Sequence, residues 1–349
     1  MSGGRAGDGG VGDVRVGLIG AGRWAGLHRE ALQQLGTDVA AVLVSSDASV
    51  RRVEADWGVP AYADADAFLA SGAMDAVIIA SPNHLHAPQA RRALQAGLHV
   101  LLEKPMALTV EDAAAVRAEA EAAGRVLAVG HEIRTFAWAK EAKRLLDAGA
   151  LGTPRHVRID LWRRPYRAGA GGWKADPAKV GSSILEEPIH YLDLAAWWLG
   201  RADALQAFAT SRAGREGAWE NLDVRVWAGE AQASVTRSIA AWGHRVEVAL
   251  VGDEGAYLAT WAGTHDADPA PRVEGWLHRG ADRDAPPEGL DLPQATGHAF
   301  DLPTQTAAFL AAVRGEGAPI ASGADGVEAV RWSLAAQRSL EAGEAKLEL

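Results

Sequence analysis

Short apolar runs alternate with longer, alanine-rich amphipathic stretches over the first third of the chain. The short runs are rich in β-branched residues, which is typical of buried parallel strands, and the longer stretches have the three-and-four spacing of helices. The predicted strands are residues 14–19, 39–44, 76–80, 99–102 and 126–129. The predicted helices are residues 24–35, 49–56, 87–96 and 110–123, the last beginning after Thr109 and ending at Gly124. Five strands and four helical crossovers predict an α/β fold with a doubly wound, Rossmann-type parallel sheet.

The pattern changes after about His131. A predicted helix over residues 135–148 ends at Gly149 and is followed mainly by strands. The predicted strands are residues 155–162, 222–227, 230–239, 245–251 and 255–261, and further helices are expected at 188–199, 304–313 and 325–340. The Pro-, Asp- and Gly-rich stretch over residues 264–293 is interpreted as irregular. Runs of strands after a βα repeat predict a second domain of the α+β type, so the expected division is 1–13, 14–131 and 132–349.

Composition narrows the function classes. The 349 residues are 48% hydrophobic and include no cysteine, which excludes disulfide scaffolds, thiolate catalysis and cysteine-ligated metals and suits a reducing cytoplasm. The formal charge of −10 argues against nucleic-acid and membrane partners and favours a small molecule. The first 13 residues, with six glycines, are expected to be a flexible tail and not a secretory signal. We therefore expect a soluble, cytoplasmic protein of two domains.

A glycine motif follows the first predicted strand, in the segment Gly20-Ala21-Gly22-Arg23-Trp24-Ala25. In the order strand, turn and helix this is the G-x-G-x-x-(G/A) pattern of dinucleotide-binding folds. The first glycine permits the tight turn, the second lets a pyrophosphate approach the backbone, and the small third residue allows close packing of helix on strand. The free N–H groups at the start of the helix would receive the anion.

The end of the second predicted strand bears on the choice between NAD and NADP. An acidic residue usually holds the ribose hydroxyls of NAD at this point, but the chain has Ser45 and Ser46 there. The two serines and Arg51 or Arg52 suit a 2′-phosphate, which slightly favours NADP. NAD remains an alternative because of Asp47. If the strand end is placed two residues later, this carboxylate lies near the ribose. The arginines are otherwise the solvated face of a helix.

Further segments resemble one enzyme family. They are Ser81-Pro82-Asn83-His84, Glu103-Lys104-Pro105, Trp173-Lys174-Ala175-Asp176-Pro177 and the stretch from Gly181 through Glu186 and His190 to Asp193. Their combination is similar to the glucose-fructose oxidoreductase and inositol dehydrogenase family, Gfo/Idh/MocA. The resemblance implies a nucleotide-binding domain over 14–131 and a substrate-binding and oligomerisation domain over 132–349 with a large, open, mostly antiparallel sheet. It also implies hydride transfer between nicotinamide and a carbon of a sugar, polyol or inositol, and a homodimer or homotetramer.

The family's catalytic group corresponds to Lys104, Glu186 and His190. Oxidation of a secondary alcohol needs a base for the hydroxyl proton, and histidine titrates near neutrality. By the resemblance Lys104 would stabilise the developing alkoxide and lower the pKa of His190, while Glu186 would orient the imidazole.

Local geometry does not decide whether Glu186 or Glu187 orients His190. Glu186 and Asp193 lie four residues before and three after His190, spacings that share one helix face. Pro188, however, favours the first helical position, which would leave Glu186 on the preceding loop with Glu187 as the cap. The family commonly has Asp-x-Gly-x-His where this chain has Glu186-Glu187-Pro188-Ile189-His190, so the fine geometry and substrate are also left open.

Other candidates lie near the expected cleft between the domains. Asn83 is predicted to contact the cofactor, or else to form an Asx turn, while His84 and His86 are interpreted as loop residues and not as metal ligands. Arg134 and Lys174 would hold substrate or be surface cations, and Asp193 would accept a substrate hydroxyl or be a surface acid. Trp173 is a candidate for stacking on a sugar, and ten of the 13 Trp residues lie after residue 150.

These assignments give two predicted sets of binding residues and no metal site. The predicted cofactor contacts are Gly20, Gly22, Arg23, Trp24, Ser45, Ser46, Arg51, Ser81, Asn83, His86, Glu103 and Lys104. The predicted substrate contacts are Lys104, Arg134, Trp173, Lys174, Glu187, His190 and Asp193. An NAD(P)-dependent dehydrogenase is the leading hypothesis. A glycosidase of the same family that retains NAD and oxidises its substrate transiently is one alternative, and a non-catalytic nucleotide sensor is the other.

Overall fold

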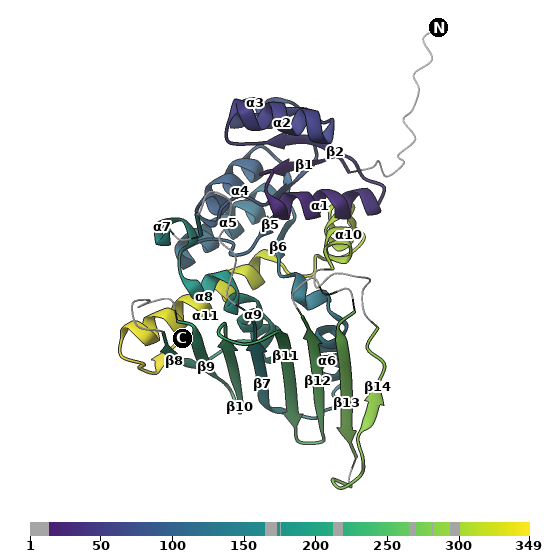
Figure 1. Ribbon diagram of the computed structural model, residues 1–349, viewed down its shortest axis with the longest axis vertical. Helices are drawn as coiled ribbons and strands as arrows, with labels where there is room; N and C mark the ends of the chain where they lie inside the picture. The colour runs from purple at the N-terminus through teal and green to yellow at the C-terminus, as the bar shows by residue number, and fades with distance from the viewer. Residues whose placement is uncertain are drawn as a thin grey trace.

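The computed structural model places two sheets one beyond the other along the long axis of the molecule (Figure 1). It describes residues 14–164, 173–174, 176–211, 219–264, 268, 270–280, 282–293 and 301–349. Within these ranges no helix combines the length and the apolar composition needed to cross a lipid bilayer.

The first sheet is parallel, and its six strands run in the order β3-β2-β1-β4-β5-β6. The strands are β1 (Val16–Ile19), β2 (Val39–Leu43), β3 (Ala61–Tyr62), β4 (Ala76–Ile79), β5 (His99–Glu103) and β6 (Leu127–Gly130). The chain order reverses between β1 and β4, which in a doubly wound sheet marks the crevice where ligands bind. Every residue of β1 and of β4 is buried, as their uninterrupted apolar runs predict. The sequence did not predict β3, because two half-buried residues are too short for a recognisable pattern.

The helices around these strands are α1 (Arg23–Gln34), α2 (Asp47–Trp57), α3 (Ala65–Ala70), η1 (Asn83–Leu85), α4 (His86–Gln95), α5 (Val110–Ala123) and η2 (Glu132–Thr135). Four of them, α1, α2, α4 and α5, lie close to the predicted positions, whereas α3, η1 and η2 were not predicted. The Thr109 hydroxyl accepts a hydrogen bond from the Asp112 amide at 3.0 Å, and Gly124 ends α5 with φ of 60°. These local signals explain why α5 is predicted without error.

The second sheet has nine strands in the order β14-β13-β12-β11-β7-β10-β9-β8-β15. Their bounds are β7 (Pro154–Trp162), β8 (Ala204–Thr210), β9 (Asn221–Ala228), β10 (Ala231–Ser238), β11 (His244–Gly252), β12 (Gly255–Gly263), β13 (Arg272–Arg279), β14 (Glu288–Leu290) and β15 (Leu347–Glu348). All neighbouring pairs are antiparallel except β7 with β10, which confirms the mostly antiparallel sheet.

The prediction of an irregular stretch over residues 264–293 is wrong, because β13 and β14 lie within it. Both strands lie near one edge of the sheet, where charged residues such as Arg272, Glu274 and Glu288 protect a strand from unwanted pairing. Because of these charges and the adjacent turn residues, the alternation of apolar and polar residues is not recognisable in the sequence. The strand β8 and the edge strand β15 are also absent from the prediction.

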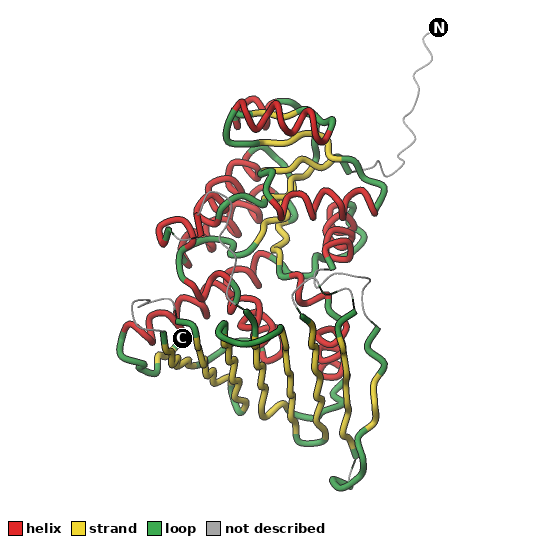
Figure 2. The backbone as a smooth tube through the Cα atoms, in the orientation of Figure 1, coloured by secondary structure: helices red, strands yellow, loops and turns green. Residues whose placement is uncertain are grey.

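Helices cover one face of the nine-stranded sheet, namely α6 (Ala137–Asp147), α9 (Pro188–Leu199) and α11 (Gly323–Glu341). Along β7 the buried Val157, Ile159 and Leu161 point into the apolar cluster that these helices share. The alternate residues of the strand, ending in Trp162, point to the other face. The strands lie side by side as a single open layer in Figure 2.

The segment between the two sheets positions the candidate site. Two short helices, α7 (Pro177–Val180) and α8 (Ser183–Glu186), lead into α9, and α7 packs against η1 at the end of β4. The chain later returns to the parallel sheet through α10 (Leu302–Val313), which packs on α1, and through α11, which packs on α5. Figure 1 shows α8 and α9 beneath the parallel sheet. The predicted domain boundary at residue 131 stays a prediction.

Candidate active site

The loop between β1 and α1 has the geometry of an anion-binding turn. Gly20 has φ of +111°, and a Cβ there would lie 2.7 Å from the Ala80 carbonyl oxygen, so only glycine fits. Gly22 caps α1 without a side-chain hydrogen bond, and a Cβ on Gly22 would meet no atom within 4 Å. The turn at the start of α1 therefore faces open space, which fits the pyrophosphate of a dinucleotide. Arg23 and Trp24 form the first turn of α1.

The residues after β2 lie at the surface. Ser45 and Arg51 are exposed, and Ser46 caps α2 by accepting a hydrogen bond from the Ser49 amide at 3.3 Å. Asp47 is the first residue of α2 and so lies beyond the end of the strand. No carboxylate occupies the strand end itself, as the sequence indicates.

The loop after β4 is tied to its surroundings. The Asn83 amide donates to the Val180 carbonyl at 3.0 Å, joining η1 to α7, and the Ser81 hydroxyl donates to Gln89. The interpretation of His86 as a loop residue is wrong, because it begins α4 and is buried. Its ring nitrogens lie 2.7 Å from the Pro105 carbonyl and 2.8 Å from the Ser81 carbonyl. His86 therefore fastens the loops that follow β4 and β5 to each other.

Glu103 ends β5 as a buried carboxylate. Its Oε1 lies 2.8 Å from Nε2 of His28, a buried residue of α1. Burial raises the pKa of Glu103, but the hydrogen bond and charge of His28, with Lys104 and His86, outweigh it and lower the pKa overall. A Cβ at Gly130 would lie 2.9 Å from Glu103 Oε1, so the glycine makes room for this carboxylate.

Lys104 and His190 meet between the sheets. The half-buried Lys104 donates through Nζ to the backbone carbonyl of Glu186, and His190 lies in the first turn of α9 with 5% of its surface exposed. Burial lowers the pKa of His190 well below its usual value, and the positive charges of Lys104, His131 and Arg163 lower it further. The imidazole is therefore neutral at pH 7, in the form that accepts a proton.

The two glutamates before His190 have separate partners. Helix α9 begins at Pro188 with Glu187 as its cap, as predicted, but Glu186 is the last residue of α8 and does not lie on a loop. The Glu186 carboxylate pairs with Lys174, whose ammonium also lies 5.6 Å from the centroid of the Trp173 ring, and Glu187 pairs with Arg163. The carboxylate beside the imidazole comes from elsewhere: Oε1 of Glu132 lies 3.6 Å from His190 Nε2.

Comparison with known proteins agrees with this geometry. A family model described as an oxidoreductase family with an NAD-binding Rossmann fold matches residues 14–131, and the model of the GFO/IDH/MocA C-terminal domain matches residues 139–258. The 1,5-anhydro-D-fructose reductase of Ensifer adhaerens is 30% identical over 283 residues, which span 78% of this chain and 79% of the relative. The chain belongs to the Gfo/Idh/MocA oxidoreductase family. The predicted resemblance is thus confirmed.

Other members are similar over much of their length. Inositol 2-dehydrogenase 1 of Saccharopolyspora erythraea is 31% identical over 252 residues, covering 69% of this chain and 72% of that one. An inositol dehydrogenase homologue of Azotobacter vinelandii, solved in complex with NAD+, superposes with a TM-score of 0.82 at 21% identity over 96% of this chain and 97% of its own. At that identity the second comparison shows the shared fold. The prediction of an NAD(P)-dependent oxidoreductase is confirmed by the family.

In this Gfo/Idh/MocA member Arg134 and Asp193 are paired with each other. The Arg134 guanidinium donates through Nε and Nη2 to the two Asp193 oxygens, each at 2.7 Å, and Nη2 also donates to Asp325 at 3.0 Å. Arg134 and Asp193 are almost fully buried. The alternatives of a surface cation and a surface acid are therefore wrong. The pair joins η2 to α9 and α11.

The sequence analysis missed two residues of this site. His131 and Glu132 follow β6, and both are buried beside α9, with the rings of His131 and His190 5.8 Å apart. A signal was present, because they stand at the carboxyl end of a parallel strand, the position that identifies Asn83 and Lys104. No short motif marks them, however, and their closeness to His190 depends on the packing of α9.

Proposed function

We propose that this oxidoreductase interconverts a secondary alcohol and a carbonyl group on a neutral sugar, polyol or inositol. The observation that carries the proposal is the convergence of Lys104 from β5 and neutral, buried His190 from α9 on one place between the sheets. A base and a fixed positive charge are the two groups that alcohol oxidation requires from a protein.

His190 is the proposed base. Its neutral imidazole takes the hydroxyl proton in oxidation and returns it in reduction. Lys104, held by the Glu186 carbonyl, places its ammonium group beside the oxygen that gains negative charge. When bound, NAD(P) supplies the hydride acceptor or donor, and Gly20, Gly22 and the start of α1 would hold its pyrophosphate.

The charge balance of the site favours an uncharged substrate. Three cations near the site are each matched by a carboxylate: Lys174 by Glu186, Arg163 by Glu187 and Arg134 by Asp193. Paired groups offer both donors and acceptors to hydroxyls, and Lys104 is assigned to the reacting oxygen, so this set leaves no further unmatched cation for a substrate carboxylate. Hydrogen bonds to hydroxyls through Lys174 and Glu187, and stacking on Trp173, are the proposed substrate contacts.

We further propose a preference for NADP. Ser45 and Arg51 are exposed where the ribose of a bound dinucleotide would lie, and the strand end carries no carboxylate to repel a 2′-phosphate. The hydroxyl of Ser46 already caps α2, so we assign the phosphate chiefly to Ser45 and Arg51.

A homo-oligomer in the cytoplasm is also proposed, with the face of the nine-stranded sheet opposite α6, α9 and α11 as its contact. That face exposes Val251 and Leu258 on neighbouring strands, and Trp162 at the end of β7 with 48% of its surface accessible. The absence of cysteine suits the cytoplasm.

The test is a parallel assay of neutral sugars, inositols and uronic acids with NAD and NADP, following the absorbance of the reduced cofactor. We expect turnover of a neutral compound, with a higher kcat/KM for NADP than for NAD. His190→Ala should lose this turnover with either cofactor. Turnover confined to uronic acids would refute the neutral substrate, and a higher kcat/KM with NAD would refute the cofactor preference. The Glu288→Gln protein, altered at the far end of the sheet, serves as the control.

A further inference from the structure

We infer that Glu132 is a positioning residue that sets how readily His190 takes up and releases its proton. This inference rests on the proposed function of His190 as the base. Glu132 is the first residue of η2, only 2% of its surface is exposed, and its Oε1 lies 3.6 Å from His190 Nε2. Nδ1 of His190 is buried without a hydrogen-bond partner in the described part of the chain. The carboxyl group that acts on the imidazole is therefore that of Glu132, and not that of Glu186, which pairs with Lys174.

Two buried carboxylates near the base are driven to opposite protonation states. Glu103 is kept ionised by the hydrogen bond and charge of His28, with Lys104 and His86. Burial raises the pKa of Glu132 to about 8, helped by the negative charge of Glu103 and opposed by Lys104. Carboxyl groups held apart in this way are typical of sites that move protons near neutral pH. Glu132 therefore carries a proton at pH 7 and loses it just above.

Charged groups from several neighbouring segments act on Glu132 and His190. They are Glu103 at the end of β5, Lys104 directly after it, His131 before η2, Arg163 after β7 with its partner Glu187, and Asp193 from α9 with its partner Arg134. Asp193 raises the pKa of Glu132, and Arg163 lowers that of His190. Arg163 and Asp193 are each matched by an opposite charge and Glu103 is paired with His28, so among these described groups Lys104 is the charge held by a backbone carbonyl and not by an ion pair.

The state of Glu132 changes the strength of the base. In oxidation the substrate O–H bond breaks and an N–H bond forms on His190, while the carbinol carbon loses hydride with its electron pair to the oxidised cofactor. The imidazolium that results lies beside Glu132. An ionised Glu132 attracts this new positive charge, whereas a protonated Glu132 does not. Oxidation is therefore favoured above the pKa of Glu132, and proton return in reduction is favoured below it.

The experiment measures kcat/KM for oxidation against pH in the wild type, Glu132→Gln and Glu132→Asp. For the wild type we expect a rise through an apparent pKa near 8, because kcat/KM reports groups of the free enzyme. Glu132→Gln should match the wild type within about twofold near pH 6, where both side chains are neutral, and fall about tenfold below it near pH 9. Glu132→Asp should restore part of the rise.

The controls separate this inference from the proposed function. Glu288→Gln removes a carboxylate remote from the site and should leave the profile unchanged. If His190→Gln retains wild-type activity, the base assignment fails. If His190→Gln is inactive while Glu132→Gln parallels the wild type at every pH, the role of Glu132 alone is refuted.

A second test uses the wild-type protein alone, so it does not depend on whether a variant folds. Infrared difference spectra across the same pH range should show a protonated carboxyl band that disappears with an apparent pKa near 8. The absence of such a band would overturn the inference.

Discussion

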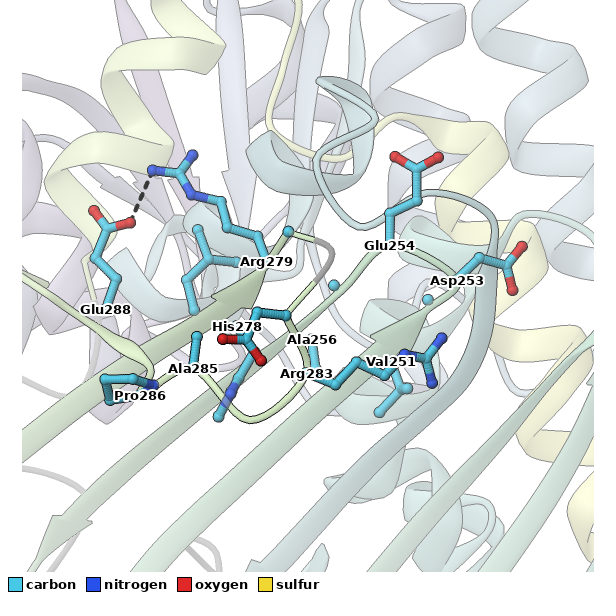
Figure 3. A pocket seen from close by; sticks show the side chains of 15 residues that line it. Val251, Asp253, Glu254, Ala256, His278, Arg279, Arg283, Ala285, Pro286 and Glu288 are labelled. Atoms are coloured by element: carbon cyan, nitrogen blue, oxygen red, sulfur yellow. Dashed lines mark hydrogen bonds and ion pairs between the residues drawn. The ribbon is translucent and has the colours of Figure 1, made fainter.

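The two ends of the nine-stranded sheet both collect charged residues, but their chemistry differs. At the end where β7 finishes with Trp162, Arg163 pairs with Glu187, and the buried Glu132 and His190 lie near the half-buried Lys104. At the opposite end a cavity of about 370 Å³ is lined by residues such as Asp253, His278 and Glu288. Its side chains come from the turn after β11 and from β13 and the hairpin that follows it (Figure 3).

Burial makes the difference between these ends. In the far cavity Arg279 donates to Glu288 at 2.8 Å, and both side chains are more than half exposed. Water screens such a pair, which contributes little to stability. At the near end the charges are removed from water, so each unmatched group shifts the pKa of its neighbours. A cavity lined by charged residues is therefore not sufficient to identify an active site, whereas buried groups with shifted pKa values mark a candidate site.

The largest difference between the two ends should appear in turnover. His190→Ala and Lys104→Ala should each lower kcat by about 10³-fold, because they remove the base and the charge that stabilises the alkoxide. Arg279→Ala at the far cavity should stay within about twofold of the wild type. Steady-state kinetics with matched circular dichroism spectra provide the measurement. Equal losses at the two ends would refute the contrast.

Folding stability should separate a buried ion pair from an exposed one. Arg134→Ala leaves Asp193 as a buried charge without its bidentate partner, which should cost about 3–5 kcal/mol in the free energy of unfolding. Arg279→Ala should cost less than about 1 kcal/mol. Urea denaturation of both variants measures these values. A cost below about 1 kcal/mol for Arg134→Ala would show that water reaches the pair.

The free energy of unfolding should decrease as the pH rises, because Glu132 loses its proton. Its pKa of about 8 in the folded protein lies above the ordinary 4.5, so the native state binds this proton more tightly than the unfolded chain. The resulting stabilisation is complete below pH 4.5 and is lost as the pH rises through 8. Glu132→Gln should lack this loss, which is of the order of a few kcal/mol.

Thermal unfolding of the wild type and Glu132→Gln between about pH 5 and 9 tests this expectation. His190 contributes with the opposite sign in both proteins, because its lowered pKa removes stability as the pH falls below 6.5. The difference between the two proteins therefore isolates Glu132. Parallel curves would refute the assignment.

The smallest effect is expected at the glycine loop. Gly22→Ala meets no protein atom within 4 Å, so folding should be unaffected, yet its methyl group enters the space assigned to the pyrophosphate. The cofactor KM should rise about tenfold, which corresponds to ~1.4 kcal/mol. Gly26→Ala, which also meets no atom within 4 Å but lies one turn further along α1, is the matched control and should bind cofactor normally.

The sequence predicted the elements whose signals are local. The buried runs of β1 and β4, the cap and end of α5, and the start of α9 at Pro188 all follow from neighbouring residues. The glycine turn was equally plain, because its function depends on the conformation of a few adjacent residues. By contrast β13 and the edge strand β14 were missed, since strands near a sheet edge are defined by their pairing partners more than by their own composition.

The sequence by itself determined the parallel sheet, the glycine loop and the presence of Lys104 and His190 in an oxidoreductase of this family. Only the tertiary structure decided which carboxylate lies beside each basic side chain. Glu132 reaches His190 from a strand end 58 positions away, and Arg134 finds Asp193 across a similar separation. Such pairings arise when α9 packs between two sheets, and no local pattern encodes them, because the free energy of a buried charge depends on every group around it.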